Sequence, residues 1–308
     1  MNLLVTGAWK NAKEYLDRIE GIGNDIQFLQ YETEKLPCDY TWAEGVIGNG
    51  LFLHHPIERF TRLKYIQLTS AGFDRVPMEY IKKQGITVYN AKGVYSIPMA
   101  EWAVLSVLEI YKNAYLFFEK QQKRIWEKDA SLLELTDKTV CIIGYGSVGS
   151  EIAKRFAAFG TKNIAVNRSE VHDTNFQQWI PLEKIDEILP EADVIILSIA
   201  LTEETRNLIS KTRLGKMKDG SVIVNCSRGS VIDEKALCQY LRQGKFRGAA
   251  LDVFCQEPLL KENELWHEPR VIISPHNSYV GDKVKDRMYR VIYRNLAEWK
   301  NRQEGATI

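Results

Sequence analysis

The sequence predicts an α/β protein with two domains, each built around a parallel β-sheet. Its 308 residues are roughly twice the length of a common domain. Short apolar runs alternate with stretches of helical period along the whole chain, which is typical of helices layered on parallel strands. One of these runs leads into a glycine-rich loop, Gly144-Tyr-Gly-Ser-Val-Gly149. We therefore expect a doubly wound parallel-sheet domain that binds a nucleotide, and a second, smaller α/β domain.

The first hundred residues are typical of one small α/β domain. Short apolar runs bounded by turn-forming residues predict strands at residues 3–6, 26–31, 45–47, 65–68 and 87–89. Helical stretches are expected around residues 12–19 and 77–83. From Pro98 to about Lys123 the apolar spacing becomes helical, and Pro98 suits the first turn of such a helix.

A second series of strands follows. Six are expected, at residues 139–143, 163–167, 194–197, 221–225, 248–251 and 271–273. Between the fourth and fifth, Asp233 is the expected N-cap of a helix that ends at Gly244. A last helical stretch, residues 282–300, is placed to pack back on the first domain, and a short tail is expected from Gly305 onward. Six strands with helices between them predict a doubly wound domain.

Composition and charge argue against several classes of function. The chain has 41 basic and 40 acidic residues, so neither nucleic acid nor a membrane surface is an expected partner. Five cysteines without CxxC spacing fit reduced thiols, and no basic, cleavable apolar stretch opens the sequence, so a cytoplasmic protein is expected. The pair His54-His55 is interpreted as a solvated loop, because no nearby ligand cluster completes a metal site, and no metal is expected.

The glycine loop follows an apolar strand and opens a helix, which is the setting of a dinucleotide-binding (Rossmann) loop. Gly144 allows the tight turn, Gly146 lets the backbone approach a pyrophosphate, and Gly149 permits close packing of the helix on the sheet. The N–H groups and the dipole at the helix start favour an anion. A tight turn that binds no ligand is the alternative.

The stretch Asn167-Arg168-Ser169 stands where an NAD enzyme usually places Asp or Glu for the ribose 2′-hydroxyl. A carboxylate there would repel a 2′-phosphate, whereas Asn, Arg and Ser can donate hydrogen bonds to one. We therefore predict that the chain prefers NADP(H) over NAD(H). The alternative is that Arg168 is a solvated surface residue and the ribose site merely tolerates either cofactor.

Three polar residues, Arg228, Glu257 and His276, come just after later strands, at the edge where open α/β sheets bind ligands. An arginine can bind a substrate carboxylate with two hydrogen bonds and polarise the adjacent keto oxygen. A carboxylate paired with His276 would fix its tautomer, which suits a general acid for carbonyl reduction. Asp252, at the end of the fifth strand, is placed to accept a hydrogen bond from a nicotinamide amide. Singly, the three also fit a surface cation, a turn and a loop residue.

The stretch from Leu68 to Val280 resembles the D-isomer-specific 2-hydroxyacid dehydrogenase family. Besides the glycine loop and Trp126, the phrases that carry the resemblance are Ser70-Ala-Gly-Phe-Asp74, Tyr95-Ser96, Ala100-Glu101, Leu201-Thr-Glu-Glu-Thr205, Asn225-Cys-Ser-Arg-Gly-Ser-Val-Ile-Asp-Glu234, Leu251-Asp-Val-Phe, Glu257-Pro-Leu and Pro275-His276. They cover about two thirds of the chain and are most specific in its last hundred residues.

The resemblance implies a Rossmann cofactor domain over residues 98–280, and a smaller flavodoxin-like α/β substrate domain formed by residues 1–97 and 281–308. It implies that Arg228 binds the substrate, that Glu257 is the partner of the histidine, and that His276 is the acid/base. Backbone N–H groups of Ala71 and Gly72 resemble a cradle for the substrate carboxylate. The cofactor-lining positions that it implies are Ser147, Val148, Ile199, Ala200, Thr205, Cys226 and Asp252. Family members are commonly dimers formed through the cofactor domain and the arm near Trp126, so a homodimer is expected.

Some positions depart from the family pattern. Ala200 stands where proline is usual, and Asn277-Ser-Tyr-Val280 differs from several subfamilies, so no single substrate follows. Residues 48–52 contain neither Arg nor Lys, which gives little support for a phosphorylated substrate. We expect an NADP(H)-preferring reductase of small 2-keto acids, of the glyoxylate or hydroxypyruvate type. The alternatives are a cofactor-sensing corepressor on the same fold, which the lack of a basic patch disfavours, and a nucleotide-binding module without catalysis.

Overall fold

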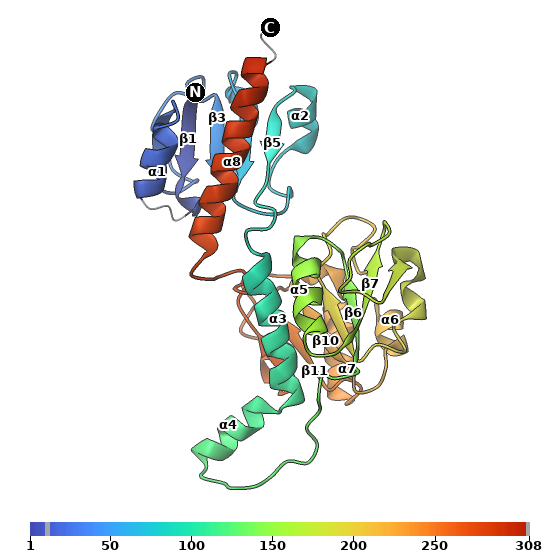
Figure 1. The fold of residues 1–308 in the computed structure, drawn as a ribbon. Helices are drawn as coiled ribbons and strands as arrows, with labels where there is room; N and C mark the ends of the chain where they lie inside the picture. Colours follow the sequence, from blue (N-terminus) through green and yellow to red (C-terminus); the bar gives the residue numbers. More distant parts are fainter. Residues whose placement is uncertain (10–12, 306–308) are drawn as a thin grey trace. The chain divides into compact units, whose positions relative to one another are not determined.

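The computed structural model of the chain describes residues 1–9 and 13–305 (Figure 1). The chain divides into two compact units: Met1–Tyr95 with Gly281–Ile308, called the first unit, and Ser96–Val280, called the second unit. Residues 306–308 of the expected tail, and residue 12 at the start of the first expected helix, lie outside the described residues. No helix in the described part of the chain is long and apolar enough to cross a membrane.

The first unit is built on a parallel sheet with the strand order β2-β1-β3-β4-β5. Its strands are β1 (Asn2–Thr6), β2 (Asp25–Leu29), β3 (Gly45–Gly48), β4 (Tyr65–Leu68) and β5 (Thr87–Tyr89). This is the order of flavodoxin-like sheets, so the fold expected for this part of the chain is confirmed. The strand expected to reach residue 31 ends at Leu29, because Leu29 is the last residue that pairs with β1.

Helices α1 (Lys13–Glu20), α2 (Met78–Lys83) and α8 (Val284–Gly305) complete the first unit. One side of α8 carries Met288, Ile292 and Leu296, four residues apart and buried. Residues with this spacing lie on one face of a helix, and they join the core cluster that contains Leu3 and Val5 of β1. The last helix of the chain therefore packs on a sheet made by the first hundred residues (Figure 1).

The second unit contains a parallel sheet with the order β12-β11-β10-β9-β6-β7-β8. Its strands are β6 (Thr139–Ile143), β7 (Lys162–Asn167), β8 (Gln178–Pro181), β9 (Val194–Leu197), β10 (Val222–Asn225), β11 (Gly248–Leu251) and β12 (Val271–Ile273). The chain runs outward from β6 in one direction and then from β9 in the other, as in Rossmann sheets. The predicted doubly wound fold is confirmed, and its switch point lies between β6 and β9.

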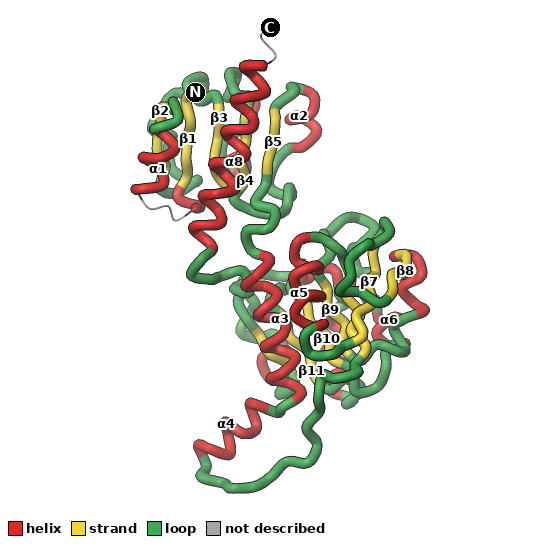
Figure 2. The backbone as a smooth tube through the Cα atoms, in the orientation of Figure 1, coloured by secondary structure: helices red, strands yellow, loops and turns green. Residues whose placement is uncertain are grey.

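Helices cover both faces of this sheet. Helices α3 (Ser96–Tyr111) and α5 (Ser147–Ala157) share a core cluster with Val140 and Ile142 of β6. Helices α6 (Lys211–Lys216) and α7 (Glu234–Arg242) share another with Cys141 and Ile143. Successive residues of β6 therefore face opposite helical layers, which explains why the central strands are continuous apolar runs. Figure 2 shows helices α3 and α5 against the strands of this sheet. Asp233 caps α7 as predicted: its carboxylate accepts a hydrogen bond from the N–H of Ala236 at 3.0 Å.

Two expectations for the second unit were wrong. The helical stretch from Pro98 to Lys123 is two helices, α3 and α4 (Ala114–Gln122), because Asn113 between them adopts a left-handed backbone with φ of 49°. The sheet has a seventh strand, β8, which the sequence analysis missed. Its four residues include Gln178 and Pro181, and among the described strands it pairs with β7 alone, at the sheet edge, where a proline is tolerated.

Candidate cofactor and catalytic site

The glycine loop lies at the switch point of the second sheet, where β6 ends and α5 begins. Gly144 has φ of +97°, and a Cβ added there would lie 2.7 Å from Cα of Ile199. A Cβ on Gly149 would lie 2.3 Å from the carbonyl oxygen of Gly144. Both positions require glycine, because the clashes are with backbone atoms that side-chain motion does not relieve. The loop is thus tight on the side that faces β9 and α5.

The same loop is open where a dinucleotide would lie. A Cβ added to Gly146 would meet no atom within 4 Å among the described residues. Gly146 is the N-cap of α5, and Ser147 and Val148 form its first turn. N–H groups in a first turn have no acceptor inside the helix, and the helix dipole favours an anion there. The residues present therefore fit the pyrophosphate of a nicotinamide dinucleotide.

The stretch after β7 lies beside this loop. The side-chain oxygen of Asn167 accepts a hydrogen bond from the N–H of Tyr145 at 3.2 Å, and its Nδ2 donates to the carbonyl oxygen of Ser169 at 2.9 Å. The guanidinium of Arg168 forms an ion pair with Glu204 and donates to Oγ1 of Thr202 at 3.3 Å. Arg168 is therefore a surface cation with a carboxylate partner in this structure.

A carboxylate that the sequence analysis missed also holds the glycine loop. Asp173 accepts hydrogen bonds from the hydroxyl of Tyr145 at 3.2 Å, from Oγ of Ser150 at 3.0 Å and from the N–H of Asn175 at 2.9 Å. Partial burial raises the pKa of this carboxyl, but the hydrogen bonds outweigh it and leave the pKa below its ordinary value. No sequence pattern marks Asp173, because it lies in an irregular segment between β7 and β8.

The other expected cofactor-lining residues lie at the same edge of the sheet. Ile199 and Ala200 follow β9, and Oγ1 of Thr205 donates to the carbonyl oxygen of Ala200 at 2.7 Å, which closes this loop. Cys226 follows β10, and its thiol donates to the carbonyl oxygen of Leu197 at 3.3 Å. Burial, with the nearby Asp252 carboxylate, raises the pKa of this thiol to about 12. Cys226 is therefore a neutral residue at physiological pH.

Arg228 lies in a turn that its neighbours fix. The side chain of Asn225 donates to the carbonyl oxygen of Arg228 at 3.1 Å and accepts from the N–H of Ser227 at 3.0 Å. A Cβ on Gly229 would lie 1.9 Å from the carbonyl carbon of Phe254. The turn that carries Arg228 is therefore in direct contact with the backbone segment that leads to Glu257.

Glu257 and His276 form a pair. Nδ1 of His276 lies 2.8 Å from Oε2 of Glu257, and Oε1 of Glu257 accepts a hydrogen bond from the N–H of Phe254 at 3.0 Å. The carboxylate is thus held by the backbone on one oxygen and by the imidazole on the other. A proton on Nδ1 directed at Glu257 leaves Nε2 as the nitrogen that can exchange a proton with a substrate.

Asp252 organises the loop that carries His276. The carboxylate is buried, and Oδ1 accepts hydrogen bonds from the N–H groups of Asn277 at 2.7 Å and Ser278 at 3.0 Å. The hydroxyls of Ser274 and Ser278 also donate to it. The N–H of His276 donates to the carbonyl oxygen of Asp252 at 2.8 Å. Asp252 therefore binds the hydroxyl of a residue before His276 and the backbone of the two residues after it, a role the sequence analysis did not predict.

The expected substrate cradle belongs to the first unit. Ala71 and Gly72 follow β4, and their carbonyl oxygens accept hydrogen bonds from Asn90 at 2.6 Å and from Ser70 at 2.9 Å. Among the hydrogen bonds that the described residues make, none uses the N–H groups of Ala71 or Gly72. The carbonyls are thus fixed and the N–H groups remain available as donors.

Two other features of the first unit bear on the expected site. Glu32 binds the loop after β3: Oε1 accepts from the N–H of Asn49 and Oε2 from that of Gly50, each at 2.7 Å. The expectation of a solvated His54-His55 pair was wrong for His55, which is buried with Nδ1 3.0 Å from the hydroxyl of Tyr40. Among the described residues, no three His, Cys, Asp or Glu side chains gather as metal ligands.

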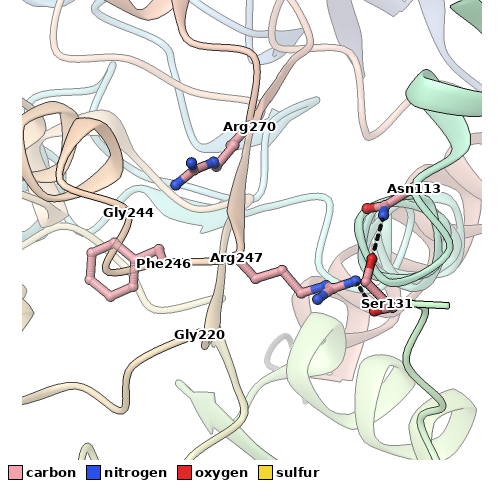
Figure 3. Close-up of a pocket in the computed structure, with 7 residues that line it drawn as sticks. All are labelled: Asn113, Ser131, Gly220, Gly244, Phe246, Arg247 and Arg270. Carbon is pink, nitrogen blue, oxygen red and sulfur yellow. Dashed lines mark hydrogen bonds between the residues drawn. The ribbon is translucent and has the colours of Figure 1, made fainter. Parts of the chain in front are cut away.

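A hollow of about 400 Å³ lies at the amino ends of β10, β11 and β12, opposite the carboxyl ends at which the glycine loop and His276 lie (Figure 3). It is lined by Asn113, Ser131, Gly220, Gly244, Phe246, Arg247 and Arg270. Arg247 donates to the carbonyl oxygen of Ser131 at 2.7 Å. None of the predicted site residues lines this hollow, and the predicted residues of the second unit gather at the carboxyl ends of the strands.

Comparison with known proteins shows the family of the chain. The model of the family described as D-isomer specific 2-hydroxyacid dehydrogenase, NAD binding domain, matches residues 104–278, more than half of the chain. The chain belongs to the D-isomer-specific 2-hydroxyacid dehydrogenase family. It is therefore a member of a family of oxidoreductases that bind a nicotinamide cofactor, and this membership favours an enzyme over the sensing alternative.

Individual dehydrogenases and reductases show how far the likeness extends. The chain is 36% identical over 238 residues to the hydroxypyruvate reductase of Thermotoga maritima, with 76% of each chain covered. It is 34% identical over 252 residues to the D-3-phosphoglycerate dehydrogenase of Methanocaldococcus jannaschii, covering 79% of this chain and 48% of that protein, so it spans about half the length of that relative. The crystal structure of a glyoxylate reductase from Paecilomyes thermophila superimposes with a TM-score of 0.82 at 26% identity, covering 96% of this chain and 94% of that one.

Proposed function

We propose that the chain reduces small 2-keto acids of the glyoxylate or hydroxypyruvate type, and that it prefers NADP(H) over NAD(H). The observation that carries the proposal is the pair formed by His276 and Glu257, 2.8 Å apart, at the edge of the sheet where the glycine loop opens. A proton donor and a dinucleotide loop at one edge are what a carbonyl reductase requires.

In the proposed mechanism, Arg228 binds the substrate carboxylate and polarises the neighbouring keto oxygen. The nicotinamide cofactor, when bound, supplies the hydride that C2 of the keto acid accepts. His276 donates a proton from Nε2 to the carbonyl oxygen, so that the keto acid becomes a 2-hydroxy acid. Glu257 keeps Nδ1 of His276 oriented and stabilises the imidazolium that precedes the transfer.

The N–H groups of Ala71 and Gly72 are proposed as further ligands of the substrate carboxylate. The N–H of Ala71 shares its peptide with the carbonyl of Ser70, which accepts a hydrogen bond from the N–H of Ala91 at 2.9 Å. The N–H of Gly72 shares its peptide with the carbonyl of Ala71, which accepts from Asn90 at 2.6 Å, so both N–H groups have a fixed direction. On this proposal the first unit is the substrate domain, completed by residues 281–308, and the residues from 98 to 280 are the cofactor domain. The cofactor-lining roles of Ser147, Val148, Ile199, Ala200 and Thr205 remain part of the proposal.

One contact of the first unit supports a small substrate without phosphate. The names of relatives at 30% identity or more include hydroxypyruvate reductase, glyoxylate reductase and D-3-phosphoglycerate dehydrogenase, so the loop after β3 carries the argument. Residues 48–52 contain no cation, and the carboxylate of Glu32 already occupies the N–H groups of Asn49 and Gly50. A carboxylate at that loop repels a phosphate.

The preference for NADP(H) is supported by the residues after β7. Asn167, Arg168 and Ser169 provide donors and a positive charge, and no carboxylate stands at the end of that strand. A guanidinium suits a phosphate monoester because it can donate two hydrogen bonds to it.

We further propose a homodimer formed through the cofactor domain and the arm near Trp126. No residue of α4, all of which are described, is buried. Tyr115, Phe118 and Trp126 are exposed, and Trp126 fully so. Large aromatic side chains gathered on one exposed arm are typical of a surface that another chain covers.

A substrate panel tests the proposal. We expect kcat/KM to be highest for glyoxylate or hydroxypyruvate, lower for pyruvate and longer 2-keto acids, and lowest for 3-phosphohydroxypyruvate, with NADPH better than NADH throughout. Preference for the phosphorylated acid would contradict the assigned substrate class. Preference for NADH would contradict the cofactor assignment alone.

A further inference from the structure

Arg168 and Glu204 connect two loops that follow different strands of the second sheet. Arg168 comes directly after β7, and Glu204 lies in the loop after β9. Their ion pair is supported by the hydrogen bond from Arg168 to Thr202 at 3.3 Å. Both side chains remain well exposed, at 54% for Arg168 and 75% for Glu204.

The strand order places this bridge over the glycine loop. β7 and β9 are not neighbours, because β6 lies between them. Two strand spacings amount to roughly 9.5 Å, so a contact between the loops after β7 and β9 must cross the carboxyl end of β6. The glycine loop begins at that end, and a dinucleotide bound there would place its adenosine ribose between the two loops.

We propose that Glu204 is a specificity-determining residue whose carboxylate competes with the cofactor 2′-phosphate for Arg168. The inference rests on the proposed function, in that Arg168 is taken to border the cofactor ribose. A 2′-phosphate carries a charge of about −1.5 to −2 at neutral pH and must displace the Glu204 carboxylate from Arg168. A cofactor without this phosphate leaves the ion pair intact.

The exposure of the pair sets the size of the effect. The loss of one exposed ion pair changes a binding constant by no more than about fivefold. Removal of the Glu204 charge also removes the repulsion between a carboxylate and the phosphate, which acts in the same direction. Substitution of Glu204 is therefore expected to tighten binding of a 2′-phosphorylated ligand about two- to tenfold.

Binding of cofactor fragments to the full-length protein tests the proposal without catalysis. The probes are adenosine 2′,5′-bisphosphate and AMP, titrated by calorimetry into wild type, Glu204→Gln, Arg168→Gln and the double variant. Glu203→Gln is the matched control, because Glu203 is the neighbouring carboxylate and pairs with Arg206 instead, at 3.7 Å. NADPH and NADH titrations then extend the comparison to whole cofactors.

We expect Glu204→Gln to tighten adenosine 2′,5′-bisphosphate binding at least twofold, to change AMP binding by less than twofold, and to lose this selectivity when Arg168 is also replaced. Glu203→Gln should behave as wild type. Equal affinity of wild type and Glu204→Gln for the bisphosphate would overturn the inference. Weaker AMP binding in Glu204→Gln would also overturn it, since Glu204 would then bind the ribose hydroxyls. A wild type that prefers NADH, with the selective effect of Glu204→Gln still present, would refute the proposed cofactor preference but not the competition.

Discussion

Replacement of Asp252 by Asn separates two roles that one carboxylate can have. The residue was expected to accept a hydrogen bond from a nicotinamide amide, whereas in the structure its oxygens accept from Ser274, Asn277 and Ser278. The side chain is 1% exposed, so water cannot replace a lost acceptor. Asn keeps the shape but removes the charge and turns one oxygen into a donor.

The expected loss of stability in Asp252→Asn follows from the number of hydrogen bonds that the carboxylate accepts. Hydrogen bonds to charged groups contribute about 1.5–3 kcal/mol and those between neutral groups about 0.5–1.5 kcal/mol, so each donor loses about 1 kcal/mol. The two backbone N–H groups cannot turn to other acceptors, whereas the two hydroxyls can. The free energy of unfolding should therefore fall by about 2 kcal/mol if the hydroxyls find other acceptors and by about 4 kcal/mol if they do not. For a unit of this size, the melting temperature should fall by roughly 5–15 °C.

Calorimetric unfolding, the cofactor Kd and kcat with glyoxylate distinguish the roles of Asp252. If Asp252 holds the His276 loop, the melting temperature and kcat both fall, kcat by about tenfold or more because His276 is displaced. Asp219→Asn is the control, because Asp219 is an exposed carboxylate paired with Lys245 at 2.7 Å. If Asp252→Asn is as stable as Asp219→Asn and weakens only cofactor binding, the loop-holding role is refuted.

Three further predictions concern other parts of the second unit. Gly229→Ala would place a Cβ 1.9 Å from the carbonyl carbon of Phe254 and so displace the turn that carries Arg228. kcat/KM should therefore fall at least about tenfold, with little change in cofactor Kd. The control is Gly21→Ala, whose Cβ would lie 3.4 Å from its nearest neighbour and which should leave kcat/KM close to that of wild type. Burial raises the pKa of the Cys141 thiol to about 12, so above about pH 8.5 unfolding releases its proton and the free energy of unfolding falls as pH rises. In Cys141→Ala this fall should be shallower by up to about 1.4 kcal/mol per pH unit. An unchanged slope would contradict the raised pKa of Cys141. Phe118→Ser should shift the sedimentation of a dimer toward the monomer, and an unchanged sedimentation profile would remove α4 from the interface.

The sequence was sufficient for the features that depend on local pattern. Continuous apolar runs predicted the central strands, because both faces of a parallel sheet are covered. The three glycines of the 144–149 loop were assigned roles that the structure explains by backbone contacts at Gly144 and Gly149 and by open space at Gly146. Asp233 was recognised as a cap because it comes directly before an apolar helical stripe.

Features that depend on contacts between distant segments could not be predicted from pattern. β8 has only four residues and ends in a proline, so it does not stand out in the sequence, and it forms a strand because β7 offers it an edge. Asn113 breaks a continuous helical pattern by a single left-handed residue. The partners of Arg168, Asp173 and Asp252 lie on other loops, so their roles appear only when the strand ends are brought together.

The proton-transfer role of the His276–Glu257 pair is tested most directly by single-turnover reduction of glyoxylate with His276→Gln, at a cofactor concentration that saturates both variant and wild type. We predict a loss of at least about two to four orders of magnitude in the rate of cofactor oxidation, with cofactor Kd unchanged within about twofold, because only the proton donor is removed. Turnover within tenfold of wild type would contradict the assignment of His276 as the proton donor.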